Sequence, residues 1–369
     1  MQEMSNSKYF VTGGGTGGHI YPALAVADEL TSEGAKVYYV GNKRNMELEL
    51  ATKKGYKFLH VGVSGMPRKL NPKFFYWGIR LVRAILYSIR YLKKYKPNAV
   101  FATGGYVSAP MIFACILTKT PYMMHDCDAM PGLVTRRLSR RAKFVSVAFE
   151  NAKKYIPNRN TIVTGNPIRD EFETLSVQQA RENMGLKNRL TICIMGGSQG
   201  AKSINNTTLE LIKEFSQELN LQVIFQTGKK NYDEVIERVQ RIYPAYEQDQ
   251  NIIIKPYFMD MISVLKSSDI VVSRAGSLSL SEICASGAAP ILIPFPYAAA
   301  NHQRINAKCL LKMGACIYIE DKELEPNKLR ETVVSLLNNP VKMNYLKQNS
   351  SNLAKFDATK KIAECLKKM

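Results

Sequence analysis

Short apolar runs alternate with helix-periodic stretches along the first half of the chain. The helical patterns cover residues 20–30, 46–54, 72–95 and 107–117. The apolar runs are rich in β-forming residues and cover residues 9–11, 36–40, 58–61, 99–102 and 122–124. Strands and helices that alternate in this way predict a parallel sheet with helices on both of its faces.

The second half repeats this order after Gly165-Asn166-Pro167 interrupts the pattern. A helical stretch ends at Gly185, and strand-like runs then follow at residues 190–195, 222–226, 251–254, 270–272 and 289–293. The sequence therefore predicts an α/β protein with two Rossmann-like, doubly wound domains, residues 1–165 and 166–369. The basic, helical tail after Pro326 is expected to have a packing role, and packing of the last helix on the first domain is left open.

Two glycine-rich turns stand where a parallel sheet binds anions. Residues 13–18 follow the first strand and lead through His19 into a helix, and residues 196–201 repeat this arrangement in the second half. Backbone N–H groups and the positive helix end converge at such a turn, so an anionic group can bind there. If the two domains face one another, both turns open into one cleft that can hold two substrates.

The first turn also matches a dinucleotide-binding fingerprint through Gly13, Gly15 and Gly18. That fingerprint expects an acidic residue at the end of the second strand, where this chain has Gly41-Asn42. A nicotinamide or flavin enzyme is therefore a minor alternative. A turn without any ligand is a further alternative, which we disfavour because the glycines outnumber what a turn requires.

Charge narrows the choice of partners. The chain has 51 Lys and Arg against 31 Asp and Glu, and no acidic residue lies between Leu50 and His125. This excess of positive charge favours nucleic acid, a phosphorylated substrate or an anionic membrane surface as a partner. Seven scattered cysteines indicate reduced thiols rather than a zinc site. The sequence contains no run of about 18 uncharged apolar residues and no apolar signal region at its start, so we expect neither a membrane span nor export.

Hydroxylic residues begin a helix after the strand at residues 270–272. Ser277, Ser279 and Ser281 can cradle a diphosphate, and Glu282 can accept two hydrogen bonds from a ribose diol. A serine-capped helix with a solvated glutamate is the alternative. Gln303 and Asn306 follow the next strand on one helical face and suit the hydroxyls of a sugar.

Seven motifs in this order resemble the GT-B glycosyltransferases and, among them, the N-acetylglucosaminyltransferase family of peptidoglycan synthesis. The motifs are GGGTGGHIYPALAVADEL, ATGGYVSAP, HDCDAMPGL, TGNPIR, MGGSQGA, SRAGSLSLSEI and NHQRINA. The resemblance implies two Rossmann-like domains that face one another across a cleft. It also implies an inverting transferase that moves N-acetylglucosamine from UDP-N-acetylglucosamine (UDP-GlcNAc) to the C4 hydroxyl of lipid I, giving lipid II. The family acts without a cofactor, as a peripheral protein on the cytoplasmic face of the cell membrane.

The resemblance also assigns residue roles. His19 is the candidate general base, a role that suits a neutral imidazole. Acceptor contacts are implied for Tyr106, His125 and Asp126. Donor contacts are implied for Thr16, Gly17, Gly18, Asp128, Arg169, Ser198, Gln199, Phe258 through its backbone, Ser277, Leu278, Ser279, Leu280, Ser281, Glu282, Gln303 and Asn306.

Two positions depart from the family pattern. Where the family commonly has His-Glu-Gln-Asn, this chain has His125-Asp126-Cys127-Asp128, and Asp128 can only accept hydrogen bonds. The change creates an Asp-x-Asp, by which another glycosyltransferase class binds a divalent metal. We predict no metal here, because two helix starts and arginine side chains can meet the diphosphate charge. Ala300 stands where many members have an acidic residue.

The helical stretch at residues 72–95 is the candidate membrane contact. We expect its stripe of Phe75, Ile79, Val82, Leu86 and Ile89 to pack in the core. Residues at the stripe's edge would then insert among anionic lipids, beside cations at the headgroups. A buried helix with a solvated cationic face is the alternative. The predicted membrane contacts are Phe74, Trp77, Leu81, Arg80 and Arg83.

Three other functions stay open at this stage. The same fold could serve a different acceptor, for example a diacylglycerol, or a UDP-GlcNAc epimerase. A nucleic-acid-binding module would explain the positive charge and is the least favoured of the three. The sequence has no recognition motif of basic and aromatic residues, so we expect no nucleic acid partner.

Overall fold

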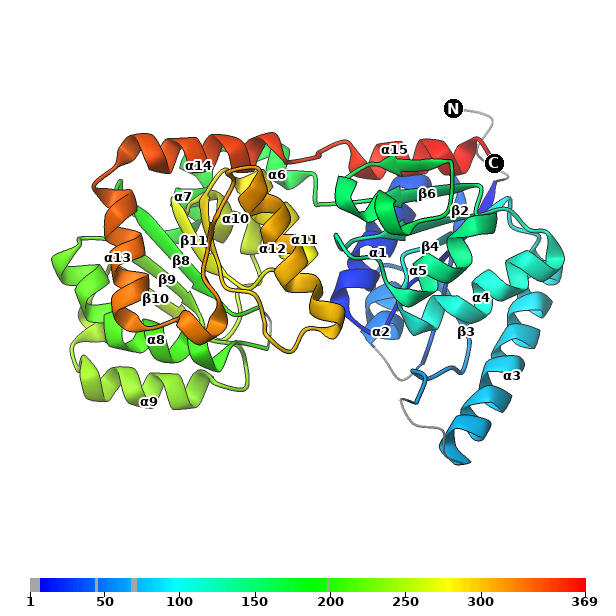
Figure 1. Ribbon diagram of the computed structural model, residues 1–369, viewed down its shortest axis with the longest axis horizontal. Coiled ribbons are helices and arrows are strands. Elements are labelled where there is room, and N and C mark those ends of the chain that lie inside the picture. The colour runs from blue at the N-terminus through cyan, green and yellow to red at the C-terminus, as the bar shows by residue number, and fades with distance from the viewer. Residues whose placement is uncertain (1–6, 44–45, 68–71, 198) are drawn as a thin grey trace. The chain divides into compact units, whose positions relative to one another are not determined.

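The computed structural model describes residues 7–43, 46–67, 72–197 and 199–369. The chain divides into two compact units, Met1–Ile168 together with Asp357–Met369, and Arg169–Phe356 (Figure 1). The division falls three residues after the boundary expected from the sequence. The last helix belongs to the first unit.

The first unit contains a seven-stranded parallel sheet in the order β3-β2-β1-β4-β5-β6-β7. Its strands are β1 (Lys8–Thr12), β2 (Lys36–Gly41), β3 (Lys57–His60), β4 (Ala99–Ala102), β5 (Tyr122–Asp126), β6 (Phe144–Val147) and β7 (Thr161–Val163). Its helices are α1 (Gly17–Ser32), α2 (Met46–Lys53), α3 (Pro72–Tyr95), α4 (Gly105–Thr118), α5 (Leu133–Leu138) and α15 (Ala358–Lys367), with short turns η1 (Ser139–Arg141) and η2 (Glu150–Tyr155).

Side chains of β1 alternate between two cores, one on each face of this sheet. Phe10 belongs to the core beneath α3 and α4, whereas Tyr9 and Val11 belong to the core beneath α1 and α15. The last helix, α15, joins the second core through Ile362, Ala363 and Leu366, and lies next to α1 (Figure 1). A sheet buried on both faces matches the continuous apolar runs of the sequence.

The second unit contains a six-stranded parallel sheet in the order β10-β9-β8-β11-β12-β13. Its strands are β8 (Thr191–Met195), β9 (Gln222–Gln226), β10 (Ile252–Lys255), β11 (Ile270–Ser273), β12 (Ala289–Leu292) and β13 (Ile317–Tyr318). Its helices are α6 (Glu171–Thr174), α7 (Val177–Met184), α8 (Lys202–Lys213), α9 (Tyr232–Ile242), α10 (Met261–Lys266), α11 (Ser277–Ser286), α12 (His302–Lys312), α13 (Pro326–Leu337) and α14 (Pro340–Asn352), with short turns η3 (Glu214–Glu218), η4 (Tyr246–Gln248), η5 (Ala299–Asn301) and η6 (Asp321–Glu323).

The predicted architecture of two doubly wound parallel sheets is confirmed. Every strand expected from the sequence is found within two residues of its predicted bounds, and the helix expected to end at Gly185 is α7, which stops at that left-handed glycine. The short strands β6, β7 and β13 were not predicted.

Each sheet reverses its order of connection at one place, between β1 and β4 in the first unit and between β8 and β11 in the second. The loops that leave these adjacent strands diverge to opposite faces of the sheet, which opens a binding site at the carboxyl edge. Both predicted glycine turns lie at these switch points, after β1 and after β8.

The two faces of α3 are the reverse of the prediction. Phe75, Ile79, Val82 and Leu86, which we expected in the core, are exposed, and only Ile89 of that stripe packs partly against it. The buried residues of α3 are Ala84, Ser88 and Leu92. Among the described residues, no helix is long and apolar enough to cross a membrane.

Candidate active site

Two glycine turns interlock at the switch point of the first unit. A Cβ atom on Gly13, after β1, would lie 1.9 Å from Thr103 Oγ1, after β4. A Cβ atom on Gly105 would lie 2.3 Å from the carbonyl oxygen of Gly14, and Gly105 also has a positive φ of 73°. Packing between the two turns therefore requires glycine at these positions, whereas the sequence analysis attributed the glycines of the first turn to ligand binding.

Gly18 has a different environment at the start of α1. Within the described part of the chain, a Cβ atom on Gly18 would meet only Thr16 Oγ1 within 4 Å, at 3.7 Å. Protein packing does not require glycine here. The lack of a side chain leaves room for a ligand group near the positive end of α1, as the predicted donor contacts of Thr16, Gly17 and Gly18 would need.

His19 is anchored to the neighbouring turn through Thr103. The His19 Nδ1 lies 2.8 Å from the carbonyl oxygen of Thr103, and the Thr103 hydroxyl donates to the carbonyl oxygen of His19 at 2.5 Å. A carbonyl oxygen can only accept, so Nδ1 carries the hydrogen. In the neutral ring, Nε2 is then the nitrogen with the lone pair.

His125 lies fully buried at the end of β5 and is held by protein groups. Its Nδ1 lies 2.9 Å from Ser146 Oγ, and its Nε2 lies 3.1 Å from Asn166 Oδ1. Burial lowers the pKa of His125 to about 4, and the hydrogen bond to Asn166 opposes this shift. The ring is therefore neutral at physiological pH. This geometry gives His125 a supporting role, and its predicted contact with an acceptor remains a prediction.

Asp126 supports the loop that follows β5. Its two carboxylate oxygens accept hydrogen bonds from the backbone N–H groups of Asp128, at 3.2 Å, and Gly132, at 3.0 Å. Burial raises the pKa of Asp126 to about 7; a hydrogen bond with Thr135 opposes the shift, and the Asp128 carboxylate adds to it. Asp126, Cys127 and Asp128 each offer one side-chain atom that could coordinate a metal ion, and these three atoms lie within 4.8 Å of one another. The backbone contacts of Asp126 account for its position without a cation.

Tyr106 lies in the first turn of α4, directly beside the first glycine turn. A Cβ atom on Gly15 would lie 3.1 Å from the Tyr106 ring. Part of the ring packs on the core beneath α4, and the residue is only half-buried. Tyr106 therefore lies at the same edge of the sheet as His19, where the acceptor contact was predicted.

In the second unit, Arg169 and Glu282 form an ion pair. The Arg169 Nη2 lies 3.1 Å from Glu282 Oε1. Burial raises the pKa of the Glu282 carboxyl, and the neighbouring Arg169 guanidinium opposes that shift. Glu282 lies on α11, whose N-terminus follows β11 at the switch point. The structure thus brings together two residues that the sequence placed at the nucleotide.

Gln303 and Asn306 hold the loop before α11. The Gln303 Oε1 accepts from the N–H groups of Ala275, at 3.2 Å, and Phe295, at 3.0 Å. The Asn306 Nδ2 donates to the carbonyl oxygen of Ala275 at 3.2 Å. Both side chains therefore lie at the carboxyl edge of the second sheet, and their contacts with a sugar remain predictions.

Ala300 and Asn301 both have left-handed backbone, with φ of 50° and 53°, directly before α12. Asparagine tolerates this conformation, whereas for alanine it costs roughly 1–2 kcal/mol. The family departure at Ala300 thus lies at the entry to the helix that carries Gln303.

Two residues of the second unit were missed from the sequence. The buried side chain of Gln226, the last residue of β9, accepts from the N–H of Phe258 at 3.0 Å and donates to the carbonyl oxygen of Gly197 at 3.3 Å. It links the two loops predicted to contact uracil and diphosphate. The Phe258 amide is thereby bonded within the protein, and the contact of its backbone with uracil remains a prediction. Ser198 lies outside the described residues, and Gln199 is exposed.

Arg274 is the second missed residue. Its guanidinium donates to the carbonyl oxygens of Ile293 and Pro294 and to Ser203 Oγ, and pairs with Asp321 at 2.5 Å. It thereby ties together the ends of β11 and β12 and the start of α8. A polar residue at the carboxyl end of a buried strand is the signal that could have found both Gln226 and Arg274.

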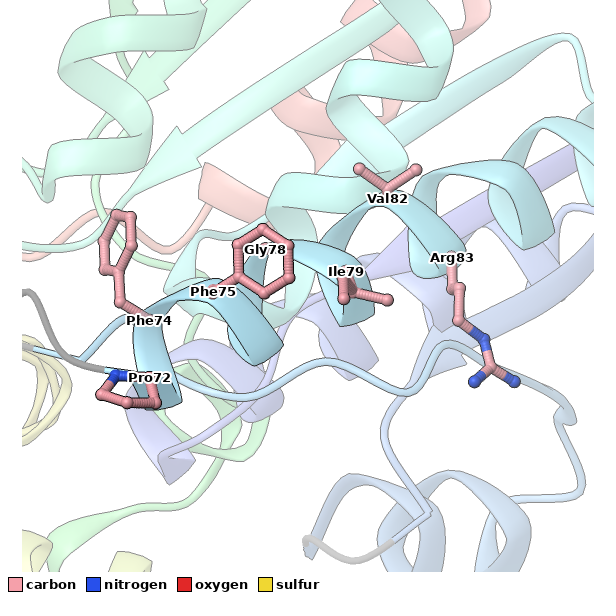
Figure 2. Close-up of a pocket in the computed structure, with 7 residues that line it drawn as sticks. All are labelled: Pro72, Phe74, Phe75, Gly78, Ile79, Val82 and Arg83. Carbon is pink, nitrogen blue, oxygen red and sulfur yellow. The ribbon is translucent and has the colours of Figure 1, made fainter.

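A separate apolar surface runs along the exposed face of α3. A shallow, open pocket of about 740 Å³ on this face is lined by Pro72, Phe74, Phe75, Gly78, Ile79, Val82 and Arg83. Figure 2 shows Phe75, Ile79 and Val82 along the helix, with the guanidinium of Arg83 extending beyond them. The predicted contacts Trp77 and Leu81 instead face the protein, since Trp77 donates to the carbonyl oxygen of Ser64 at 2.9 Å and Leu81 packs on the core.

Comparisons with known proteins cover nearly the whole chain. Residues 9–147 match the glycosyltransferase family 28 N-terminal domain, and residues 191–365 match the glycosyltransferase family 28 C-terminal domain. A relative from Desulforamulus reducens is 38% identical over 363 residues, which cover 97% of this chain and 98% of that protein. It is named UDP-N-acetylglucosamine–N-acetylmuramyl-(pentapeptide) pyrophosphoryl-undecaprenol N-acetylglucosamine transferase.

Two solved structures add to this. The crystal structure of MurG from Acinetobacter baumannii aligns with a TM-score of 0.80 at 27% identity, covering 98% of this chain and 100% of that one. A UDP-GlcNAc 2-epimerase from Neisseria meningitidis aligns with a TM-score of 0.69 at 15% identity, over 99% of this chain and 100% of the other, which shows the fold alone. The fold by itself therefore does not separate transferases from epimerases.

Proposed function

The chain belongs to glycosyltransferase family 28, and from this premise we propose that it transfers N-acetylglucosamine from UDP-GlcNAc to the C4 hydroxyl of N-acetylmuramic acid in lipid I. The product is lipid II, the disaccharide-pentapeptide precursor of peptidoglycan. The observation that carries the proposal is the 38% identity over 97% of the chain with a relative named for this transfer. The anchored His19 supports it independently.

The donor binds to the carboxyl edge of the second sheet. The N-terminus of α11 and the turn after β8 receive the diphosphate, because both present backbone N–H groups at a switch point. Glu282 accepts hydrogen bonds from the ribose hydroxyls, and its pairing with Arg169 favours the ionised carboxylate that this role needs. Phe258 reads the base, and Gln303 with Asn306 contacts the sugar.

Catalysis uses His19 of the first unit. The C4 hydroxyl oxygen of the acceptor attacks the anomeric carbon of the donor, and the bond from that carbon to the phosphate oxygen breaks. UDP leaves with the electron pair of that bond, and the hydroxyl proton passes to His19 Nε2. The configuration inverts because the hydroxyl attacks the anomeric carbon from the side opposite the departing phosphate. The Thr103 carbonyl accepts from Nδ1–H and thereby stabilises the imidazolium that forms.

The acceptor is membrane-bound, and the exposed face of α3 supplies a docking surface for an anionic bilayer. Phe75, Ile79, Val82 and Leu86 are exposed, and Arg83 extends beside them (Figure 2). Apolar residues enter the interface while cations contact the lipid headgroups, each worth about 1 kcal/mol. We therefore place the protein peripherally on the cytoplasmic membrane face and assign its positive charge to lipid and phosphate rather than to nucleic acid.

A transfer assay tests this proposal. Purified protein with labelled UDP-GlcNAc is offered lipid I, diacylglycerol or no acceptor in parallel. The proposal predicts labelled lipid II with lipid I alone. Transfer to diacylglycerol, or formation of the 2-epimer of the donor sugar without any acceptor, would instead identify one of the other two activities. Folded protein that yields no labelled product would contradict the proposal.

A further inference from the structure

Thr103 contacts His19 at two separate atoms. Its carbonyl oxygen accepts from His19 Nδ1 at 2.8 Å, and its hydroxyl donates to the His19 carbonyl oxygen at 2.5 Å. Two hydrogen bonds therefore join the residues, one to the backbone of His19 and one to its ring. One residue thus fixes the backbone and the ring of His19 together.

Thr103 itself has little freedom to move. It is only 1% exposed, directly follows β4, and its N–H donates to the carbonyl oxygen of Thr12 at 2.9 Å. Gly13 packs against its side chain so closely that a Cβ atom there would lie 1.9 Å from Thr103 Oγ1. The anchor of His19 is thus part of the central strand pair of the sheet.

The His19 ring is also confined by the turn that follows Thr103. A Cβ atom on Gly104 would lie 3.4 Å from the ring, and one on Gly105 would lie 3.2 Å from His19 Cδ2. Contact of this kind limits the tilt of the ring, but sterics alone do not choose between its two nitrogens. The hydrogen bond from Nδ1 to the Thr103 carbonyl makes that choice.

We propose that Thr103 is a positioning residue of the transfer reaction, whose side-chain hydroxyl holds His19 in the Nδ1–H tautomer with Nε2 as the proton acceptor. This inference rests on the proposed function and adds a residue to its site. The hydroxyl acts through geometry: by fixing the His19 backbone, it keeps the ring within reach of the Thr103 carbonyl. Without it, the carbonyl remains, but the ring can shift away, and misplacement of about 1 Å costs up to about 100-fold in rate.

The matched variants are Thr103→Ala and Thr103→Ser. Both remove the methyl group, and they differ only in the hydroxyl, so their comparison isolates that group. Its short hydrogen bond goes to the His19 carbonyl oxygen at 2.5 Å, and a longer one goes to the Thr12 carbonyl oxygen at 3.4 Å. Valine is unsuitable, because a methyl group in place of the hydroxyl would lie about 2.5 Å from the His19 carbonyl oxygen. Circular dichroism and thermal unfolding check that each variant is folded, and UDP binding, which the proposal assigns to the second unit, checks that the donor site is unaffected.

Two readouts are needed. In the transfer assay, Thr103→Ala should lower kcat roughly tenfold with the KM for UDP-GlcNAc unchanged, and Thr103→Ser should stay close to wild type. In ¹⁵N spectra of histidine-labelled protein, the chain has only four histidines, and His19→Gln assigns the signal of interest. That signal should show the Nδ1–H tautomer in wild type and Thr103→Ser, and a mixture of tautomers in Thr103→Ala.

The spectrum requires no substrate, so the two possible failures are distinguishable. An unchanged His19 signal in Thr103→Ala, or equal kcat values for the alanine and serine variants, would overturn the role of Thr103. Wild-type protein with the expected His19 tautomer but without transfer to lipid I would instead overturn the proposed function.

Discussion

His19 and His125 belong to the same edge of the first sheet but lie in different environments. His125 is fully buried, and its two ring nitrogens form hydrogen bonds with Ser146 and Asn166. His19 is partly exposed and has its ring tied through Nδ1 to a backbone carbonyl. Sequence motifs suggested both residues for the site, but they could not show that one side chain is fully buried and the other partly exposed.

The buried His125 makes stability depend on pH. Because its pKa is about 4 in the folded protein and about 6.5 when unfolded, the unfolded chain binds more protons between these values. The His125 contribution is fully present above pH 6.5 and is lost as the pH falls towards 4, by roughly 3 kcal/mol in total. Urea unfolding at pH 7 and pH 5, followed by the fluorescence of the single Trp77, measures the effect.

The control for this prediction is His125→Gln. Asp126 acts in the opposite direction, because its pKa is raised to about 7 and the folded state gains a proton as the pH falls. The difference between wild type and His125→Gln removes that contribution. A stability difference between them that does not change with pH would contradict a buried, neutral His125.

Glu282 should set the preference for ribose in the donor. A carboxylate that accepts from both ribose hydroxyls discriminates against a nucleotide that lacks one of them. We expect the wild type to bind UDP at least about tenfold more tightly than 2′-deoxy-UDP, and Glu282→Ala to bind both with similar, weaker affinity. Calorimetry measures this, with the exposed Glu331→Ala as control. Retained discrimination in Glu282→Ala would place the ribose contact elsewhere.

At the scale of elements, the position of most strands and helices could be predicted from sequence, but the orientation of α3 could not. Both of its faces carry large apolar side chains, so periodicity alone did not identify the face that packs on the sheet. The packing face contains the smaller residues Ala84 and Ser88, which allow close approach of α4. β13 was missed because two residues give no periodic signal.

The exposed face of α3 should govern membrane binding. Leu86 is 60% exposed, and full insertion of a leucine side chain contributes about 1.5–3 kcal/mol, so Leu86→Ser should weaken binding to phosphatidylglycerol vesicles about tenfold or more. Vesicle sedimentation measures this. Val341 in the second unit is 79% exposed, and Val341→Ser is the matched control. Equal loss of binding in the two variants would contradict docking through α3.

At the scale of the whole molecule, the tandem repeat of strand order predicted two sheets, but not the path of the C-terminus. The apolar residues of α15 could have packed on either sheet, and nothing in their spacing distinguishes the two. The structure places Ile362 and Leu366 in the core beneath α1, where Lys367 pairs with Glu33 at 2.7 Å. A contact between segments more than 300 residues apart is not encoded in any local pattern.

The candidate site was predictable to a similar extent. Motifs identified the residues at both switch points, because strand ends carry binding groups in this architecture. They did not reveal Thr103, Gln226 and Arg274, which hold neighbouring loops of the site through hydrogen bonds. Nor did they reveal that Gly13 and Gly105 serve loop packing. Such roles depend on three-dimensional contacts between neighbouring strands.

The most direct test of the account is His19→Ala, measured for transfer of labelled N-acetylglucosamine to lipid I and for binding of UDP. Loss of a general base should lower kcat by about 10²–10⁴-fold. UDP affinity should remain within about twofold of wild type, since the proposed nucleotide site lies in the second unit. Transfer by His19→Ala at the wild-type rate would contradict the account, because the proton of the attacking hydroxyl would then pass to another group.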